Sequence, residues 1–127
     1  MAFCLTAQAQ SAADVEQAKA AAETWLALAD SNHHASTWAE AAEPLQQAVT
    51  QADWTQALQG LRAPLGQLKR RTVQSATFTK DLPGAPAGDY VVIVFASQFA
   101  NRPTAVETVT PMRTKDGSWK VSGYYLR

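Results

Sequence analysis

The chain has 127 residues, which suits one domain and is short for two. Its 11 acidic and 11 basic side chains give a formal net charge of zero. This balance argues against nucleic acid or an anionic lipid surface as a partner, because both are bound by basic surfaces. No apolar run approaches the ~20 residues of a membrane-spanning helix. We therefore predict no membrane span, no cofactor and no nucleic-acid partner.

Residues 1–11 are interpreted as the remnant of a secretory signal peptide, with a disordered leader as the alternative. Ala7-Gln8-Ala9 fits the small-x-small pattern that signal peptidase cuts after, although no basic residue precedes it. The single cysteine, Cys4, lies in this segment, so a mature chain starting near Gln10 would hold no thiol. An oxidising compartment is compatible with that composition. We expect a periplasmic or secreted protein whose residues 12–127 form a single domain.

The first half of that domain has helical periodicity. Residues 12–30 carry one apolar stripe with steps of three or four: Val15, Ala18, Ala22, Trp25 and Ala29. Asn32 is a plausible stop, because asparagine tolerates the left-handed conformation found past helix ends. Residues 33–49 hold one or two shorter helical pieces, with Pro44 suited to a first turn. Residues 50–65 form the last helix, so we predict three N-terminal helical regions.

From Lys69 the period changes to two, which is typical of strands. We predict strands over residues 69–80, 90–99, 106–113 and 119–126, separated by a loop rich in proline and glycine, by Asn101-Arg102-Pro103 and by an Asp-Gly turn. Helices followed by strands indicate an α+β fold, and short loops favour a four-stranded antiparallel meander. We expect the sheet to curl around the first helix.

The register of the last hairpin can also be predicted. A four-residue turn over residues 114–117 pairs Met112 with Trp119 and avoids placing two basic residues opposite each other. Trp119 would then share the apolar face with Met112 and Thr110. Glu107 alternates with that set, so we expect it to be solvated on the outer face. Pro111 predicts a bulge, because proline interrupts a ladder.

The candidate ligand-binding residues are mostly aromatic, because a curled sheet with helices can leave an open mouth that aromatic side chains line. They are Trp38, Tyr90, Phe99, Glu107, Tyr124 and Tyr125. The four tryptophans, one to an element, fit core packing better than a ligand-lining cluster. We predict no catalytic residue, with Glu107 as a general base beside Tyr124 or Tyr125 as the alternative.

Two polar clusters, one of histidines and one of basic residues, are interpreted as solvent-exposed rather than functional. His33-His34 would need further ligands to hold zinc, so we interpret the pair as exposed loop residues and predict no metal site. Lys69-Arg70-Arg71 is the one basic cluster, and we expect it to be a solvated entrance to the first strand.

Four runs of sequence carry a family resemblance: Ala22-Glu23-Thr24-Trp25-Leu26, Trp54-Thr55-Gln56-Ala57-Leu58, Arg62-Ala63-Pro64-Leu65-Gly66, and Asp116-Gly117-Ser118-Trp119-Lys120-Val121-Ser122-Gly123-Tyr124-Tyr125. Through them the chain resembles a bacterial exported family known only as a domain of unknown function. The resemblance covers nearly all of the chain after Ala12. It implies a small secreted or periplasmic α+β domain, similar in outline to cystatin-like or nuclear-transport-factor-like cones, and it carries over no active-site residue.

These observations lead to three hypotheses. The first is a non-enzymatic module that binds a small apolar ligand, a peptide or a protein partner through the concave face of the sheet or an edge strand. The second is a cone-type isomerase or hydrolase with Glu107 as base. The third is a homodimer formed through the sheet.

Overall fold

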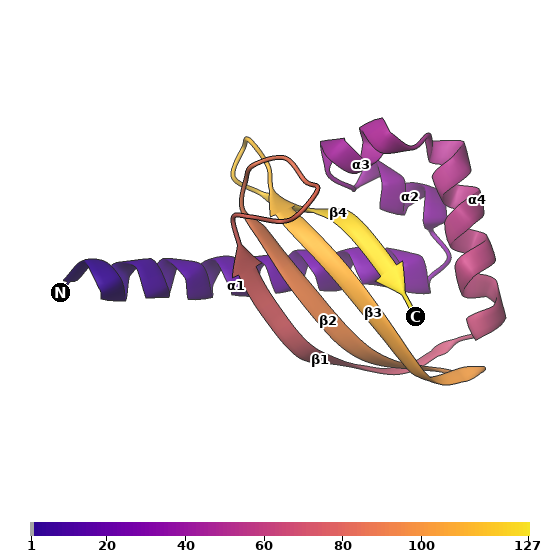
Figure 1. Ribbon diagram of the computed structural model, residues 1–127. Helices are drawn as coiled ribbons and strands as arrows, with labels where there is room; N and C mark the ends of the chain where they lie inside the picture. The colour runs from indigo at the N-terminus through magenta and orange to yellow at the C-terminus, as the bar shows by residue number, and fades with distance from the viewer. Residues whose placement is uncertain (1) are drawn as a thin grey trace.

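Four helices and a four-stranded sheet make up the computed structural model, which describes residues 2–127 and, for side chains, Ser11 onward (Figure 1). The helices are α1 (Ala2–Asp30), α2 (His34–Ala39), α3 (Glu43–Ala48) and α4 (Gln51–Arg62), followed by the 3-10 turn η1 (Ala63–Leu65). The strands are β1 (Leu68–Thr79), β2 (Tyr90–Phe99), β3 (Arg102–Arg113) and β4 (Trp119–Leu126). They pair antiparallel in the order β1-β2-β3-β4, so the predicted α+β fold with a meander sheet is confirmed.

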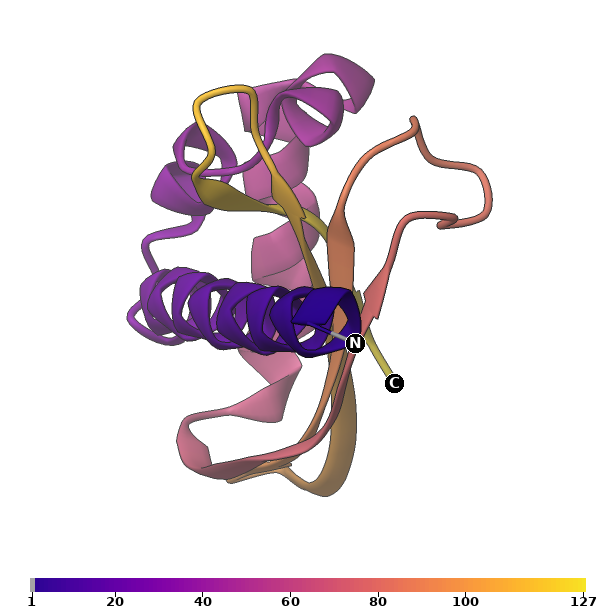
Figure 2. The same cartoon turned by 90° about the vertical axis from the view of Figure 1, so that its left-hand side faces the viewer.

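The helices lie on one side of the sheet. α1 crosses behind the strands in Figure 1, and α2, α3 and α4 form a group beyond the edge of β4. Figure 2 shows α1 end-on against this inner face, while the loop between β1 and β2 projects from the other side. Among residues 2–127, no helix is long and apolar enough to cross a bilayer.

α1 packs on the sheet through small residues. Ala18 and Ala22 are fully buried, and their short side chains let the helix backbone approach the strands closely. Trp25 is only 3% exposed, and its ring lies 6.3 Å from that of Trp54 and 5.4 Å from that of Tyr124. The helix ends at Asp30, and Asn32 just beyond it has a left-handed φ of 64°, as predicted. It starts earlier than expected, because the helical backbone already includes residues 2–11.

Residues 33–49 form two separate helices, which was one of the two possibilities, so the described chain has four α-helices before the sheet instead of the three predicted. Ala42 has an extended backbone, with φ −67° and ψ 154°, so the chain cannot continue as one helix. Its N–H donates to the carbonyl oxygen of Val121 at 2.8 Å, which docks the α2–α3 connection on β4. Pro44 occupies the first turn of α3, as predicted.

The predicted hairpin register is wrong by one residue. Arg113, rather than Met112, lies opposite Trp119, because the loop is longer than expected. Thr114 N–H donates to the carbonyl of Ser118 at 2.7 Å, and the carboxylate of Asp116 accepts from Ser118 N–H at 3.0 Å, so residues 114–118 form the connection. The predicted bulge is present between Thr110 and Pro111.

The difference of one residue between the predicted and the observed register reverses the prediction of which face of β3 is buried. Side chains alternate along a strand, so an error of one residue exchanges its two faces. Ala105, Glu107 and Val109 face the core, whereas Val106 and Thr108 are only half-buried. The expectation that Glu107 is solvated on the outer face is therefore wrong.

We predict that Trp25→Ala lowers the free energy of unfolding by about 3–5 kcal/mol, because it removes a buried aromatic ring that the packed neighbours cannot replace. Its indole N–H also donates to the carbonyl of Thr37 at 2.9 Å. Urea denaturation of both proteins measures the change. Leu61→Ala on α4 is the control, since Leu61 is 42% exposed and its loss should have a small effect. Equal denaturation midpoints for the Trp25 variant and wild type would contradict the assigned core.

Candidate functional site

The buried face of the sheet holds an ionic cluster that joins six elements. We call it the Glu107 cluster, and its members are Asp30, Arg62, Arg71, Ser97, Glu107 and Tyr124. Asp30 ends α1 and Arg62 ends α4, while the other four come from β1, β2, β3 and β4 in turn. Glu107 at its centre is 0% exposed.

Glu107 accepts hydrogen bonds on both carboxylate oxygens. Oε1 accepts from Arg71 Nε at 2.8 Å and from Ser97 Oγ at 2.5 Å. Oε2 accepts from an Arg62 terminal nitrogen at 3.1 Å and from the hydroxyl of Tyr124. These four donors match the acceptor sites of an ionised carboxylate, so the buried charge is fully paired.

Asp30 completes the pairing of the two arginines. It accepts from Arg62 at 2.5 Å and from both terminal nitrogens of Arg71, at 2.8 and 3.0 Å. Burial alone would lower the pKa of Arg71, but the hydrogen bonds to Asp30 and the charge of Glu107 raise it above its ordinary value. Two cations thus face two anions, which is the arrangement that makes burial of charge tolerable.

The arginines also pack on aromatic rings. The Arg62 guanidinium carbon lies 5.2 Å from the ring centre of Phe99, and that of Arg71 lies 6.0 Å from the ring centre of Phe95. The expectation that the basic run is a solvated strand entrance is therefore wrong for Arg71, although Lys69 and Arg70 are exposed.

Tyr124 links the Glu107 cluster to the tryptophans. Its hydroxyl donates to Glu107, and its ring packs on that of Trp25. Burial, together with the negative charge of Glu107, raises the pKa of Tyr124 above its ordinary value. The inward Glu107 beside a tyrosine hydroxyl is the geometry that the enzymatic alternative requires. Both oxygens of Glu107 are nevertheless occupied by protein donors.

A groove opens where the helices meet the outer side of β4. It has a volume of about 440 Å³. We call it the Gly123 groove. It is lined by Leu45 of α3, Val49 directly after α3, Trp54 of α4, residues 82–86 of the loop, Tyr90, Thr110 and Met112 of β2 and β3, and residues 122–125 of β4. A Cβ at Gly123 would meet only the Cβ of Thr110, at 4.0 Å, so the missing side chain leaves the floor open.

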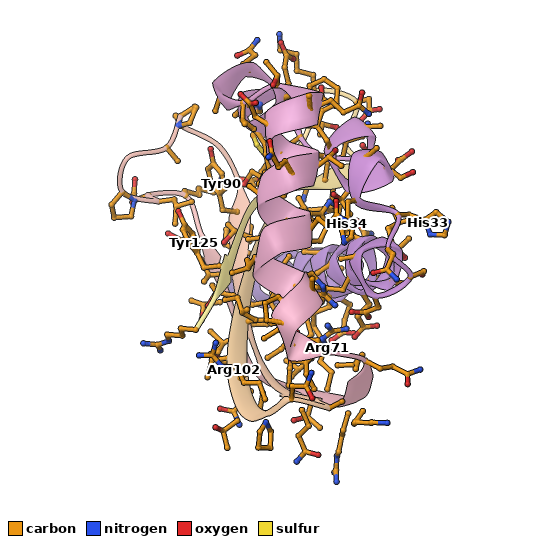
Figure 3. The ribbon with its side chains drawn as sticks, turned by 90° about the vertical axis from the view of Figure 1, so that its right-hand side faces the viewer. His33, His34, Arg71, Tyr90, Arg102 and Tyr125 are labelled. Carbon is orange, nitrogen blue, oxygen red and sulfur yellow. The ribbon has the colours of Figure 1, made fainter. Side chains whose placement is uncertain are left out.

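Three of the six candidate ligand-binding residues meet in this groove. Tyr90 is buried and donates its hydroxyl to the carbonyl of Pro86 at 2.7 Å, which ties β2 to the loop. Tyr124 forms part of the wall, and Tyr125 is 71% exposed. Figure 3 shows Tyr90 and Tyr125 on the same side of α4.

The other three candidates lie elsewhere. Phe99 and Glu107 belong to the buried interior and do not line the Gly123 groove. Trp38 lies apart on α2, where its indole N–H donates to the carbonyl of Val49 at 2.9 Å. Sequence reasoning favoured core packing over ligand lining for Trp54, whereas Trp54 both packs against the core and lines the groove. It gave no role to Asp30 and Arg62, because nothing in the chain marks two residues 32 positions apart as partners.

The two histidines border a different hollow, of about 650 Å³, which is lined mostly by polar side chains. Figure 3 shows His33 pointing away from the molecule and His34 pointing inward. Burial, followed by the positive charge of Arg62, lowers the pKa of His34. Within the described residues, no three His, Cys, Asp or Glu side chains are grouped as metal ligands.

One known protein family matches most of the chain. Residues 21–124 match the family described as a protein of unknown function, DUF4019. The chain belongs to this family. No curated protein matches the chain, and no solved structure matches it. The DUF4019 span includes every member of the Glu107 cluster and the whole Gly123 groove except Tyr125.

We predict that Glu107→Gln in this DUF4019 chain lowers the free energy of unfolding by about 3–5 kcal/mol, because it leaves the buried Arg62 and the partly buried Arg71 facing one carboxylate. Denaturant titration followed by tryptophan fluorescence measures the loss. Glu16→Gln is the matched control, since Glu16 forms a surface pair with Lys19 and is 73% exposed. Its effect should stay within about 0.5 kcal/mol. Similar small effects for both variants would show that the buried cluster does not hold the fold.

A second prediction concerns alkaline pH. Above about pH 10 an unfolded chain loses the tyrosine proton, whereas folded Tyr124 keeps its proton because its pKa is raised. The contribution of Tyr124 to stability is therefore complete below that pH and is lost as the pH rises further. Tyr124→Phe has no such proton, so its free energy of unfolding should fall less steeply above about pH 10. Equal slopes for the two proteins, measured by urea denaturation, would contradict this assignment.

Proposed function

We propose that this chain is a non-enzymatic binding domain that holds a small apolar ligand or a peptide in the Gly123 groove. The observation that carries the proposal is the meeting of Trp54, Tyr90, Tyr124 and Tyr125 around one groove. These residues come from three different elements, α4, β2 and β4, so only the fold brings them together. The volume of about 440 Å³ falls in the range typical of ligand sites.

The chemistry of the walls favours an apolar guest. Pro83, Pro86, Leu45, Val49 and Met112 add aliphatic surface to the aromatic rings. Tyr125 is largely exposed beside this surface, and an exposed aromatic ring at a groove is a typical anchor for a bound partner. The larger hollow at His33 and His34 lacks such rings among its lining residues.

The enzymatic alternative, with Glu107 as general base, has one observation in its favour: the carboxylate lies beside the hydroxyl of Tyr124. A base must reach the proton that it removes. Glu107 is fully buried and accepts hydrogen bonds from two arginines, a serine and a tyrosine. We therefore assign it a structural role.

We further propose that the protein is exported to the periplasm or secreted, and that its curved sheet wrapped on α1 is related in outline to cystatin-like or nuclear-transport-factor-like cones. The export proposal rests on the small-x-small pattern at Ala7-Gln8-Ala9. Among the described side chains, the first buried one is Asp14, which forms an ion pair with Arg113. Cleavage after Ala9 would leave that contact in place. We also keep the proposal that two copies of the chain form a homodimer through the sheet.

Native mass spectrometry of the protein purified from its own host tests the function. We expect wild type to carry a bound small molecule or peptide, and to have the mass of a chain starting near Gln10. Gly123→Leu should be free of the bound molecule, because the new side chain fills the groove floor. The backbone at Gly123 is not left-handed, so this substitution adds no strain.

Gly60→Leu is the matched control, since Gly60 lies on α4 with nothing within 4 Å of an added Cβ. This variant should carry the same bound molecule as wild type. A ligand that survives Gly123→Leu would place the site elsewhere, and wild type without any bound molecule would count against the proposal.

A further inference from the structure

The outer edge of β4 has backbone groups that face away from the sheet. Val106 and Arg127 exchange two hydrogen bonds, of 2.7 and 2.9 Å, and so form a hydrogen-bonded pair of the β3–β4 ladder. In an antiparallel ladder such pairs alternate with non-bonded pairs. Tyr125 opposite Thr108 is therefore the next bonded pair. Tyr124 and Leu126, which alternate with these residues, point their N–H and C=O groups away from β3.

Another segment of the same chain already forms a hydrogen bond with this edge nearer the start of β4. Val121 lies in a non-bonded position of the ladder, and its carbonyl accepts the N–H of Ala42 from the α2–α3 connection. Ala42 has the extended backbone of a strand residue. In the described part of the chain, no corresponding bond from a loop or helix reaches the edge-facing groups of Tyr124 or Leu126.

The Gly123 groove lies beside this open part of the edge. Residues 122–125 of β4 form one wall, and Val49 and Trp54 of the helical group form part of the other. Figure 3 shows the end of β4 running clear of α4, with Tyr125 beside it. A guest in the groove therefore meets apolar walls and a row of backbone donors and acceptors together.

We infer that the guest is an extended peptide, which adds to the edge of β4 as a fifth strand and places alternate apolar side chains in the Gly123 groove. This inference rests on the proposed function. The backbone of such a peptide would pair with the N–H and C=O groups of Tyr124 and Leu126, as in other cases of strand addition. A small apolar molecule would fill the groove but leave those groups without a protein partner.

An array of capped hexapeptides with apolar residues at alternate positions supplies the probe. The tightest binder is then titrated into isotopically labelled protein, and amide hydrogen exchange is followed by NMR. The amide protons of Tyr124 and Leu126 should exchange more slowly in the complex. The amide of Tyr125 should not change, because it already bonds to β3 in the free protein.

A pair of variants isolates the backbone contact. Leu126→Pro removes the edge-facing N–H and leaves the ladder with β3 intact, since proline is tolerated where the N–H points out of the sheet. Leu126→Ala shortens the side chain to a similar extent but keeps the N–H. The proline variant should bind the peptide about tenfold more weakly than the alanine variant, the effect of one lost hydrogen bond.

Four outcomes would overturn the inference that a peptide adds to the edge of β4. Equal affinity of the two Leu126 variants, or a bound peptide that leaves the amides of Tyr124 and Leu126 unprotected, would show that the edge is not used. A third outcome is that no hexapeptide binds, while an apolar molecule is found in wild type and is absent from Gly123→Leu. In that case the peptide inference fails, and the proposed function stands. Protection of the same amides by self-association, detected by sedimentation without peptide, would assign the edge to a second copy of the chain.

Discussion

The structure depends on the pairing of four charges, of which Arg62 and Glu107 are buried and Asp30 and Arg71 are partly buried. Asp30, Arg62, Arg71 and Glu107 come from α1, α4, β1 and β3, so their ion pairs join the long helix, the helical group and the sheet at one point. A desolvated charge is costly unless a partner is held close to it. The positions of these elements are therefore coupled, because a shift of any one of them would leave a buried charge without its partner.

Tyr124 carries this constraint to the surface. Its hydroxyl belongs to the Glu107 cluster, its ring packs on Trp25, and the residue also lines the Gly123 groove. Trp54 has a similar double role, since it packs on Trp25 and lines the groove. The walls of the groove are thus built on the most constrained part of the fold. In the proposed function, walls held in this way would be preorganised, which would reduce the entropy lost when a guest binds.

The strand prediction shows how a local error can reverse a conclusion about function. The alternation in β3 was recognised correctly, but the turn was taken as four residues long, whereas the hydrogen bonds of Thr114, Asp116 and Ser118 extend the loop through Ser118. That difference of one residue exchanged the two faces of β3. It moved Glu107 from the expected outer face to the centre of the core, where the carboxylate pairs with Arg62 and Arg71.

The amino-acid sequence by itself determined the order and type of the elements, the left-handed backbone at Asn32, the first turn of α3 at Pro44 and the bulge at Pro111. These features follow from local periodicity and from the backbone preferences of single residues. Only the tertiary structure decided that Arg62 and Arg71 pair with Asp30 and Glu107, and that Tyr90, Trp54 and Tyr125 meet at one groove. Those contacts join residues far apart in the chain. Their existence depends on strand register and on how helices pack against the sheet, and neither is encoded in any short stretch of residues.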